Sequence, residues 1–129
     1  MVKALLDTHI FLWWITDDPR LSGRVREIVA DGRNELFLSA ASGWEIAIKA
    51  RLGRLEVPRD LERFLTEQLS RNSIRTLPIY LNHTVHTYIL PDHHRDPFDR
   101  LLVSQALLEK LSVLSVDPQV ALYPVEVVW

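Results

Sequence analysis

The hydrophobic residues of the chain follow two spacings that alternate from end to end. Short, nearly continuous apolar runs predict buried strands at residues 2–6, 36–39, 112–116 and 125–128. Between them, apolar residues recur at three and four positions, which is typical of amphipathic helices. This spacing predicts helices over residues 10–15, 20–30, 42–52, 60–69, 81–90 and 97–111. A weaker strand signal covers residues 75–79, where Pro78 favours a sheet edge or a strand end.

Strands that alternate with helices are typical of a mainly parallel sheet covered by helices on both faces. We therefore predict an α/β fold with three layers, in the order helices, sheet, helices. The 129 residues suit one domain that spans residues 1–129, and this length is sufficient for a hydrophobic core. No internal repeat, linker or low-complexity segment interrupts the pattern.

Composition excludes several kinds of site. The chain has no cysteine, so disulfides, zinc–thiolate sites and thiol catalysis are excluded. A net charge of −2 argues against a globally basic nucleic-acid binder, but it is compatible with a local basic rim around an acidic site. The first residues lack the features of a signal peptide, and no apolar run approaches the ~18 residues that span a membrane. We therefore expect a cytoplasmic protein with no membrane partner.

Acidic residues stand where the predicted strands end and where the following helices begin. Asp7 and Asp117 each follow an apolar strand, and Glu45 lies in the predicted first turn of the helix after the second strand. Asp99 lies in the first turn of the helix that opens at Pro97. In an open parallel sheet these positions share the edge at the carboxyl ends of the strands. We therefore predict that the four carboxylates converge.

Carboxylates that converge repel one another and raise each other's pKa. A divalent cation relieves this repulsion, and oxygen ligands without cysteine or clustered histidine favour Mg²⁺, with Mn²⁺ as a substitute, over zinc. Each acid also has a purely structural explanation. Asp7 and Asp117 suit turns after strands, Glu45 suits a capping box with Ser42, and Asp96 suits a helix N-cap. Only the set taken together favours a metal site.

Three stretches of the chain resemble the PIN-domain family, and most of all the VapC toxins of type II toxin–antitoxin pairs. They are Leu5-Leu6-Asp7-Thr8-His9, Trp44-Glu45-Ile46-Ala47-Ile48-Lys49 and Asp96-Pro97-Phe98-Asp99-Arg100-Leu101-Leu102. The resemblance covers nearly the whole chain, and the Asp-Pro-Phe-Asp-Arg run is its most specific part. It implies a PIN-like fold and a Mg²⁺-dependent endoribonuclease that is inhibited by a VapB-type antitoxin and is usually dimeric. The implied partners are RNA, an antitoxin and a second copy of the chain.

The resemblance also implies roles for the acidic residues. The family's catalytic acids fall on Asp7, Glu45, Asp99 and Asp117. We hypothesise that Asp7 and Asp99 bind metal directly, that Glu45 acts through water, and that Asp117 completes a second, weaker site. Asp96 precedes the family's usual third acid, so it is a cap, an accessory ligand or both.

Candidate substrate-binding residues are Thr8, Lys49 and Arg100. Thr8 either hydrogen-bonds Asp7 or caps the first helix. Lys49 and Arg100 lie close to acids in the sequence and are candidates to hold RNA phosphates, although solvated helix faces are the usual place for such charges.

Two pairs of adjacent residues stand apart from this set. We interpret His93-His94 as part of a surface loop, because adjacent histidines do not point the same way. One residue of Trp13-Trp14 suits the core, and the other suits a groove that takes an antitoxin helix or strand.

Two other functions compete with the ribonuclease. Phosphoryl transfer through an aspartyl intermediate at Asp7 requires a second aspartate two residues later, and His9 stands there instead. The other alternative is a non-catalytic PIN-like module that binds RNA or protein. Retention of all the acidic positions argues against that loss of chemistry.

Overall fold

Five short parallel strands form the centre of the computed structural model, which describes all residues from Met1 to Trp129. The strands are β1 (Lys3–Leu6), β2 (Glu35–Ser39), β3 (Ile74–Leu77), β4 (Ser112–Leu114) and β5 (Val127–Val128). Their order across the sheet is β3-β2-β1-β4-β5. The predicted parallel sheet is confirmed, and β3 lies at an edge as Pro78 indicated.

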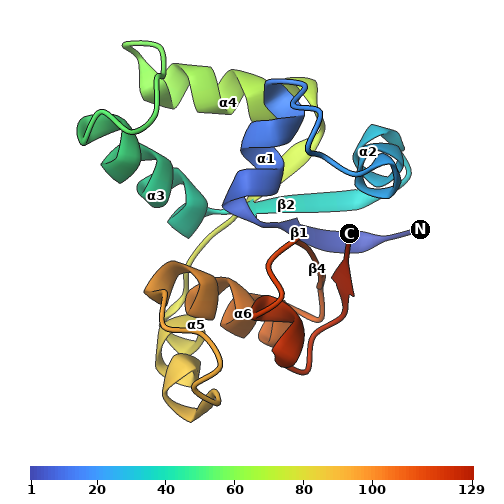
Figure 1. Cartoon of the computed structure of the whole chain (residues 1–129), viewed down its shortest axis with the longest axis vertical. Helices are drawn as coiled ribbons and strands as arrows, with labels where there is room; N and C mark the ends of the chain where they lie inside the picture. The colour runs from blue at the N-terminus through green and yellow to red at the C-terminus, as the bar shows by residue number, and fades with distance from the viewer.

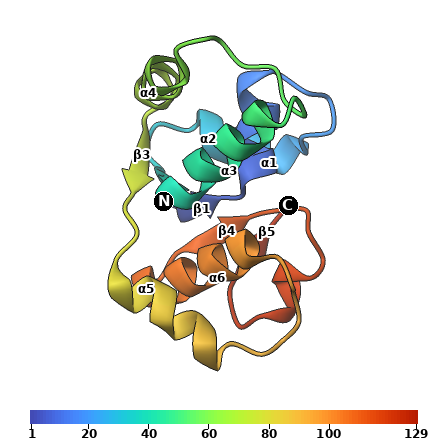
Figure 2. The same cartoon turned by 90° about the vertical axis from the view of Figure 1, so that its left-hand side faces the viewer.

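Helices cover both faces of the sheet (Figures 1 and 2). One face carries α1 (Thr8–Ile15), α2 (Gly23–Ala30), α3 (Ala40–Arg51) and α4 (Leu61–Arg71). The other carries α5 (Leu81–His86), the 3₁₀ turn η1 (Thr87–Ile89), α6 (Pro97–Glu109) and a second 3₁₀ turn, η2 (Val120–Leu122). The predicted α/β/α layering is confirmed.

The side chains of the central strand β1 pack into two separate hydrophobic cores, one on each face of the sheet. Ala4 and Leu6 point into one cluster, with Ile10 and Phe11 of α1, whereas Leu5 points into the other, with Val103 of α6. All six side chains are completely buried. Burial on both faces explains why β1 reads as an uninterrupted apolar run rather than an alternating one. It also holds the carboxyl end of β1 rigidly between the two helical layers.

The structure corrects several predicted boundaries. Helix α3 begins at Ala40 after the N-cap Ser39, not at Ser42, so the proposed capping box with Glu45 is wrong. The hydroxyl of Ser39 accepts a hydrogen bond from the Ala41 N–H (3.0 Å) and satisfies the helix start earlier. Strand β4 ends at Leu114 rather than Val116, and the predicted helix 81–90 is α5 followed by η1. None of the helices has the length and hydrophobicity to cross a membrane.

Candidate functional site

Asp7 lies where β1 ends and α1 begins, and it is 6% exposed. Its Oδ1 accepts a hydrogen bond from the His9 N–H (3.2 Å), and its Oδ2 accepts one from the Ser115 hydroxyl (2.7 Å). Asp7 is therefore the N-cap of α1, and the capping role considered for Thr8 is wrong. The Thr8 hydroxyl is buried and donates to Ser42 Oγ (2.8 Å), which joins α1 to α3.

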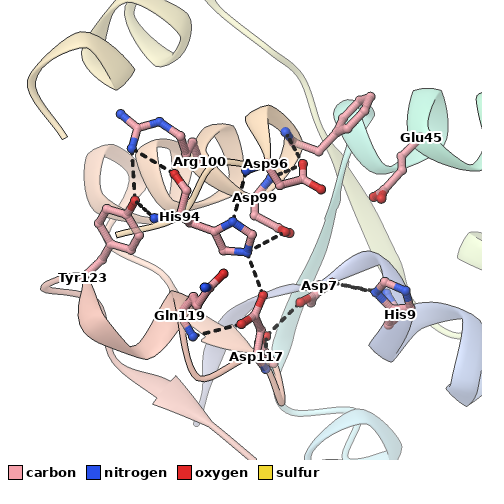
Figure 3. Close-up of polar contacts among 12 residues, drawn as sticks. Asp7, His9, Glu45, His94, Asp96, Asp99, Arg100, Asp117, Gln119 and Tyr123 are labelled. Atoms are coloured by element: carbon pink, nitrogen blue, oxygen red, sulfur yellow. Dashed lines mark hydrogen bonds and ion pairs between the residues drawn. The ribbon is translucent and has the colours of Figure 1, made fainter. Parts of the chain in front are cut away.

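The start of α6 is built as the sequence predicted, with Pro97 in the first turn. Asp96 is the N-cap, and its Oδ1 accepts hydrogen bonds from the N–H groups of Phe98 (2.8 Å) and Asp99 (3.4 Å). Because Asp96 satisfies the helix start, the Asp99 carboxylate is left free to face the edge of the sheet (Figure 3).

A histidine from the loop before α6 lies between two carboxylates. The Nε2 atom of His94 is 3.0 Å from Asp99 Oδ2 and 2.8 Å from Asp117 Oδ2. The ligand atoms of these three residues all lie within 4.8 Å of one another. The interpretation of His94 as a surface-loop residue is therefore wrong, since its side chain is only 11% exposed. A histidine in a polar loop carries no local signal that could have identified this role.

Ser115 connects the two halves of the site. Its hydroxyl donates to Asp7 and accepts the Asp117 N–H (3.1 Å). Asp117 Oδ1 accepts a further hydrogen bond from the Gln119 N–H (2.9 Å), so Asp117 is both a turn residue and a member of the cluster. An unbroken chain of contacts therefore runs from Asp7 through Ser115, Asp117 and His94 to Asp99 (Figure 3).

Glu45 faces this cluster from the opposite side (Figure 3). It lies in the second turn of α3 rather than the first, is 8% exposed, and its carboxylate is 3.2 Å from Lys49 Nζ. Its negative charge contributes to raising the pKa of Asp99. The structure therefore brings Glu45 to the same edge as Asp7, Asp99 and Asp117, as the sequence predicted.

The electrostatics of the site are those of crowded carboxylates. Burial raises the pKa of Asp99 to about 7, and the negative charges of Asp7 and Asp96 add to this effect. Burial also pushes the pKa of Asp7 upward, but hydrogen bonds from His9 and Ser115 outweigh it and leave this pKa below 3.8. Oxygen donors held close together, one of them disfavouring its own charge, fit a divalent cation.

Arg100 does not face the carboxylates. Its guanidinium donates hydrogen bonds to the carbonyls of Pro91 (2.8 Å) and Thr87 (2.9 Å) and to the Tyr123 hydroxyl (3.0 Å). These contacts occupy the donors that a phosphate would need, so they contradict the predicted substrate-binding role. Arg100 instead fixes the loop between η1 and α6.

A profile of the PIN domain matches residues 4–125. The chain belongs to the PIN-domain family. It is similar to ribonuclease VapC22 of Mycobacterium tuberculosis, with 30% identity over 108 residues that cover 83% of this chain and 81% of the relative. It is also similar to ribonuclease VapC16 of the same organism, with 38% identity over 89 residues. That match covers 60% of this PIN domain but only 63% of VapC16, which is less than two thirds.

Solved structures share the fold at low sequence identity. The VapBC2 complex of Rickettsia felis bound to a promoter DNA fragment aligns over 99% of this PIN domain and 98% of that chain, with 17% identity and a TM-score of 0.71. FitAcB of Neisseria gonorrhoeae aligns over 96% and 95%, with 20% identity and a TM-score of 0.60. Identities this low establish the fold alone.

Proposed function

We propose that this PIN domain is a Mg²⁺-dependent endoribonuclease and the toxin of a VapBC-type toxin–antitoxin pair. The observation that carries the proposal is the convergence of Asp7, Glu45, Asp99 and Asp117 at one sheet edge, with Asp99 and Asp117 close enough to share a cation. The names of the relatives VapC16 and VapC22 support the ribonuclease class.

Each residue of the site would have a different role in phosphodiester hydrolysis. Asp99 and Asp117 would hold Mg²⁺ or Mn²⁺, with Asp7 completing the set from β1, and Asp96 acts as the cap of α6. The bound ion would neutralise charge on the phosphate and activate a water. Glu45 would orient that water.

Basic groups for the phosphate lie on the same side as Glu45. Lys49 Nζ lies beside Glu45, and the ring of His9 lies 3.7 Å from Asp7, so both are placed to attract an RNA phosphate. Thr8 is 1% exposed and directs its hydroxyl into the protein, so it supports α1 rather than binding substrate.

The test is cleavage of RNA by the purified chain with Mg²⁺. Asp7→Asn and Asp99→Asn should each lower the cleavage rate by at least about 100-fold, because even residues that only support metal ligands cost 10–100-fold when changed. The matched control is Asp92→Asn, a fully exposed aspartate of the loop before α6, which should leave the rate unchanged. Asparagine variants as active as the parent would exclude the assignment. A parent that binds RNA without cleaving it, with Mg²⁺ or Mn²⁺, would favour the non-catalytic module.

An antitoxin segment would dock beside the acid site. A cavity of about 330 Å³ lies between α1, α3 and α4, with Trp13 and Phe64 among its apolar lining residues and His9 and Lys49 on the side of the acids. Trp13 packs edge-on against Trp129 and beneath Arg20, and it is only partly buried where it lines this cavity. Trp13→Ala should therefore weaken binding of a VapB-type antitoxin, as measured by calorimetry, without abolishing RNA cleavage.

A second copy of the chain would cover α5 and η1. Leu81, Val85, Tyr88 and Ile89 recur at helical spacing and are 60–91% exposed, which is unusual for large apolar side chains. Val85→Arg should convert the dimer to a monomer in sedimentation equilibrium, because a charge would replace the apolar contact. A parent chain that is already monomeric would contradict this part of the proposal.

A further inference from the structure

His94 is held at both ring nitrogens. Its Nδ1 accepts a hydrogen bond from the backbone N–H of Asp96 (3.1 Å). A ring nitrogen that accepts a hydrogen bond carries no proton, so the proton of the neutral ring is on Nε2. The Nε2–H therefore donates to Asp117 Oδ2 (2.8 Å), and Nε2 also lies 3.0 Å from Asp99 Oδ2.

We propose that His94 is a positioning residue for the cation site and not one of its ligands. Its Nε2–H orients the Asp117 carboxylate by a hydrogen bond, and the ring lies against the Asp99 carboxylate, so the two acids are kept at the spacing that one cation requires. This inference rests on the proposed function, because it assumes that the two carboxylates bind a divalent cation.

The hydrogen bonds of the two carboxylates agree with this role. Asp117 Oδ1 accepts a hydrogen bond from the Gln119 N–H and Asp117 Oδ2 accepts one from His94, whereas Asp99 Oδ2 only lies within 3.0 Å of the His94 ring nitrogen. Asp99 Oδ1 accepts no hydrogen bond from the protein, so it is left for the cation. Carboxylates that bind metals are commonly oriented by such outer hydrogen bonds.

The alternative, in which Nε2 binds the metal, conflicts with the loop. A ligating Nε2 must offer its lone pair, which moves the ring proton to Nδ1. That proton would then face the Asp96 N–H, and two donors would oppose each other at the start of α6. The loop cannot easily turn away, because the His94 N–H donates to the Tyr123 hydroxyl (2.9 Å), which Arg100 also holds. The ring is therefore fixed as a donor.

The first test measures Mn²⁺ binding by the full chain with electron paramagnetic resonance. His94→Ala should weaken Mn²⁺ binding by about 10–100-fold, the usual effect of removing a residue that orients metal ligands. His94→Gln should restore part of the affinity, because a glutamine amide N–H can reach nearly the position of Nε2–H. The matched control is His93→Ala, which removes an exposed neighbouring histidine that packs on Tyr123 and touches no carboxylate. Unchanged affinity in His94→Ala, or no recovery in His94→Gln, would overturn the proposal.

The second test uses the unaltered protein, so it holds even if a variant fails to fold. Nitrogen-15 spectra of the histidine rings should show His94 protonated at Nε2, both without metal and with saturating Mg²⁺. Protonation at Nδ1 in the Mg²⁺ form would overturn the proposal. So would a nitrogen coupling to bound Mn²⁺ that is present in the parent and absent in His94→Ala, since that coupling identifies a ligand.

These outcomes separate this inference from the proposed function. A parent chain that binds no Mn²⁺ at millimolar concentration would overturn both. A parent that binds Mn²⁺ and cleaves RNA, with His94→Ala equal to it in affinity, would overturn only the role of His94.

Discussion

Asp7 and Asp99 carry the same side chain near the start of a helix, on the same edge of the sheet, but their surroundings differ. At the β1–α1 junction, Asp7 is itself the cap, and its two oxygens accept hydrogen bonds from His9 and Ser115. At the start of α6, Asp96 is the cap, and the Asp99 carboxylate accepts no hydrogen bond from the protein, although its Oδ2 lies 3.0 Å from His94 Nε2.

The pKa values of the two carboxyl groups shift in opposite directions as a result. Both groups are penalised by burial, but hydrogen bonds stabilise the charge of Asp7, whereas Asp99 also faces the charges of Asp7 and Asp96. The hydrogen bonds therefore keep Asp7 negatively charged. Asp99 is the group whose negative charge a bound cation would stabilise most. On the Asp7 side of the site the negative charge is stabilised by hydrogen bonds, whereas on the Asp99 side it is unfavourable.

The largest expected effect of this difference is on the pH dependence of the unfolding free energy of the metal-free protein. The folded-state pKa of Asp99, about 7, lies above the value of 3.8 that an aspartate has in the unfolded chain, so the folded protein binds more protons than the unfolded chain between about pH 4 and 7. Stability should therefore fall as pH rises through this window, by about 4 kcal/mol at most. Urea unfolding from pH 4 to 8 measures this change.

Two other groups shape the same pH profile. The pKa of Asp7 is lowered, so its contribution is present above pH 3.8 and is lost only at lower pH. The hydrogen bond to Asp7 raises the pKa of His9, whose contribution is present below pH 6.5 and is lost as pH rises through the raised value. In Asp99→Asn, only the contribution of His9 to the decrease of unfolding free energy with rising pH should remain. A slope between pH 4 and 6 that survives this change would contradict the role given to Asp99.

The two asparagine variants should change stability in opposite directions at pH 8 without metal. Asp99→Asn removes a buried charge among like charges and should raise the midpoint of thermal unfolding. Asp7→Asn weakens charge-assisted hydrogen bonds from His9 and Ser115 and should cost about 2 kcal/mol. If both variants raised stability, or both lowered it, the opposite electrostatic surroundings assigned to Asp7 and Asp99 would be wrong.

A smaller effect is expected where the two sides meet. Ser115→Ala removes the donor to Asp7 Oδ2 and the acceptor of the Asp117 N–H, and the serine is 1% exposed. We expect a loss of about 1 kcal/mol in unfolding free energy and a rise in the pKa of Asp7. Carbon-13 titration of the aspartate carboxyls measures that pKa. Ser112→Ala, at the start of β4 three residues before Ser115 and half-buried, is the matched control.

The parts of the fold that local rules dictate were predictable from the sequence. The apolar run of β1, the proline at the start of α6 and the cap at Asp96 each have one dominant local cause, and each is confirmed. The gathering of acids also follows from the rule that parallel strands end at a common edge. The start of α3 was missed because Ser39 and Ser42 are equally good caps, and only the end of β2 chooses between them.

The contacts that join distant segments were not predictable. Ser115 reaches Asp7 across 108 positions of sequence, and His94 reaches Asp117 across 23. No local pattern marks either residue, because a serine after a strand and a histidine in a polar loop are ordinary. The structural role of Arg100 was not predictable for the same reason. Its partners are backbone carbonyls of a loop, and every residue has a backbone carbonyl, so no sequence pattern identifies them.

The smallest stability effect should come from Lys49, on the side of the site opposite Asp99. Lys49 pairs with Glu45, four residues earlier on α3, and its own side chain is 30% exposed; such pairs within a helix contribute about 0.3–0.5 kcal/mol, so Lys49→Gln should barely change the unfolding free energy. If Lys49 attracts RNA phosphate, the variant should still weaken RNA binding across all sequences and lower the salt slope of binding by about 1. The matched control is Arg51→Gln, an exposed cation in the last turn of the same helix. Equal losses of RNA affinity in the two variants would mean that RNA is attracted by the total positive charge of α3. Lys49 would then have no specific role in binding phosphate beside the carboxylates.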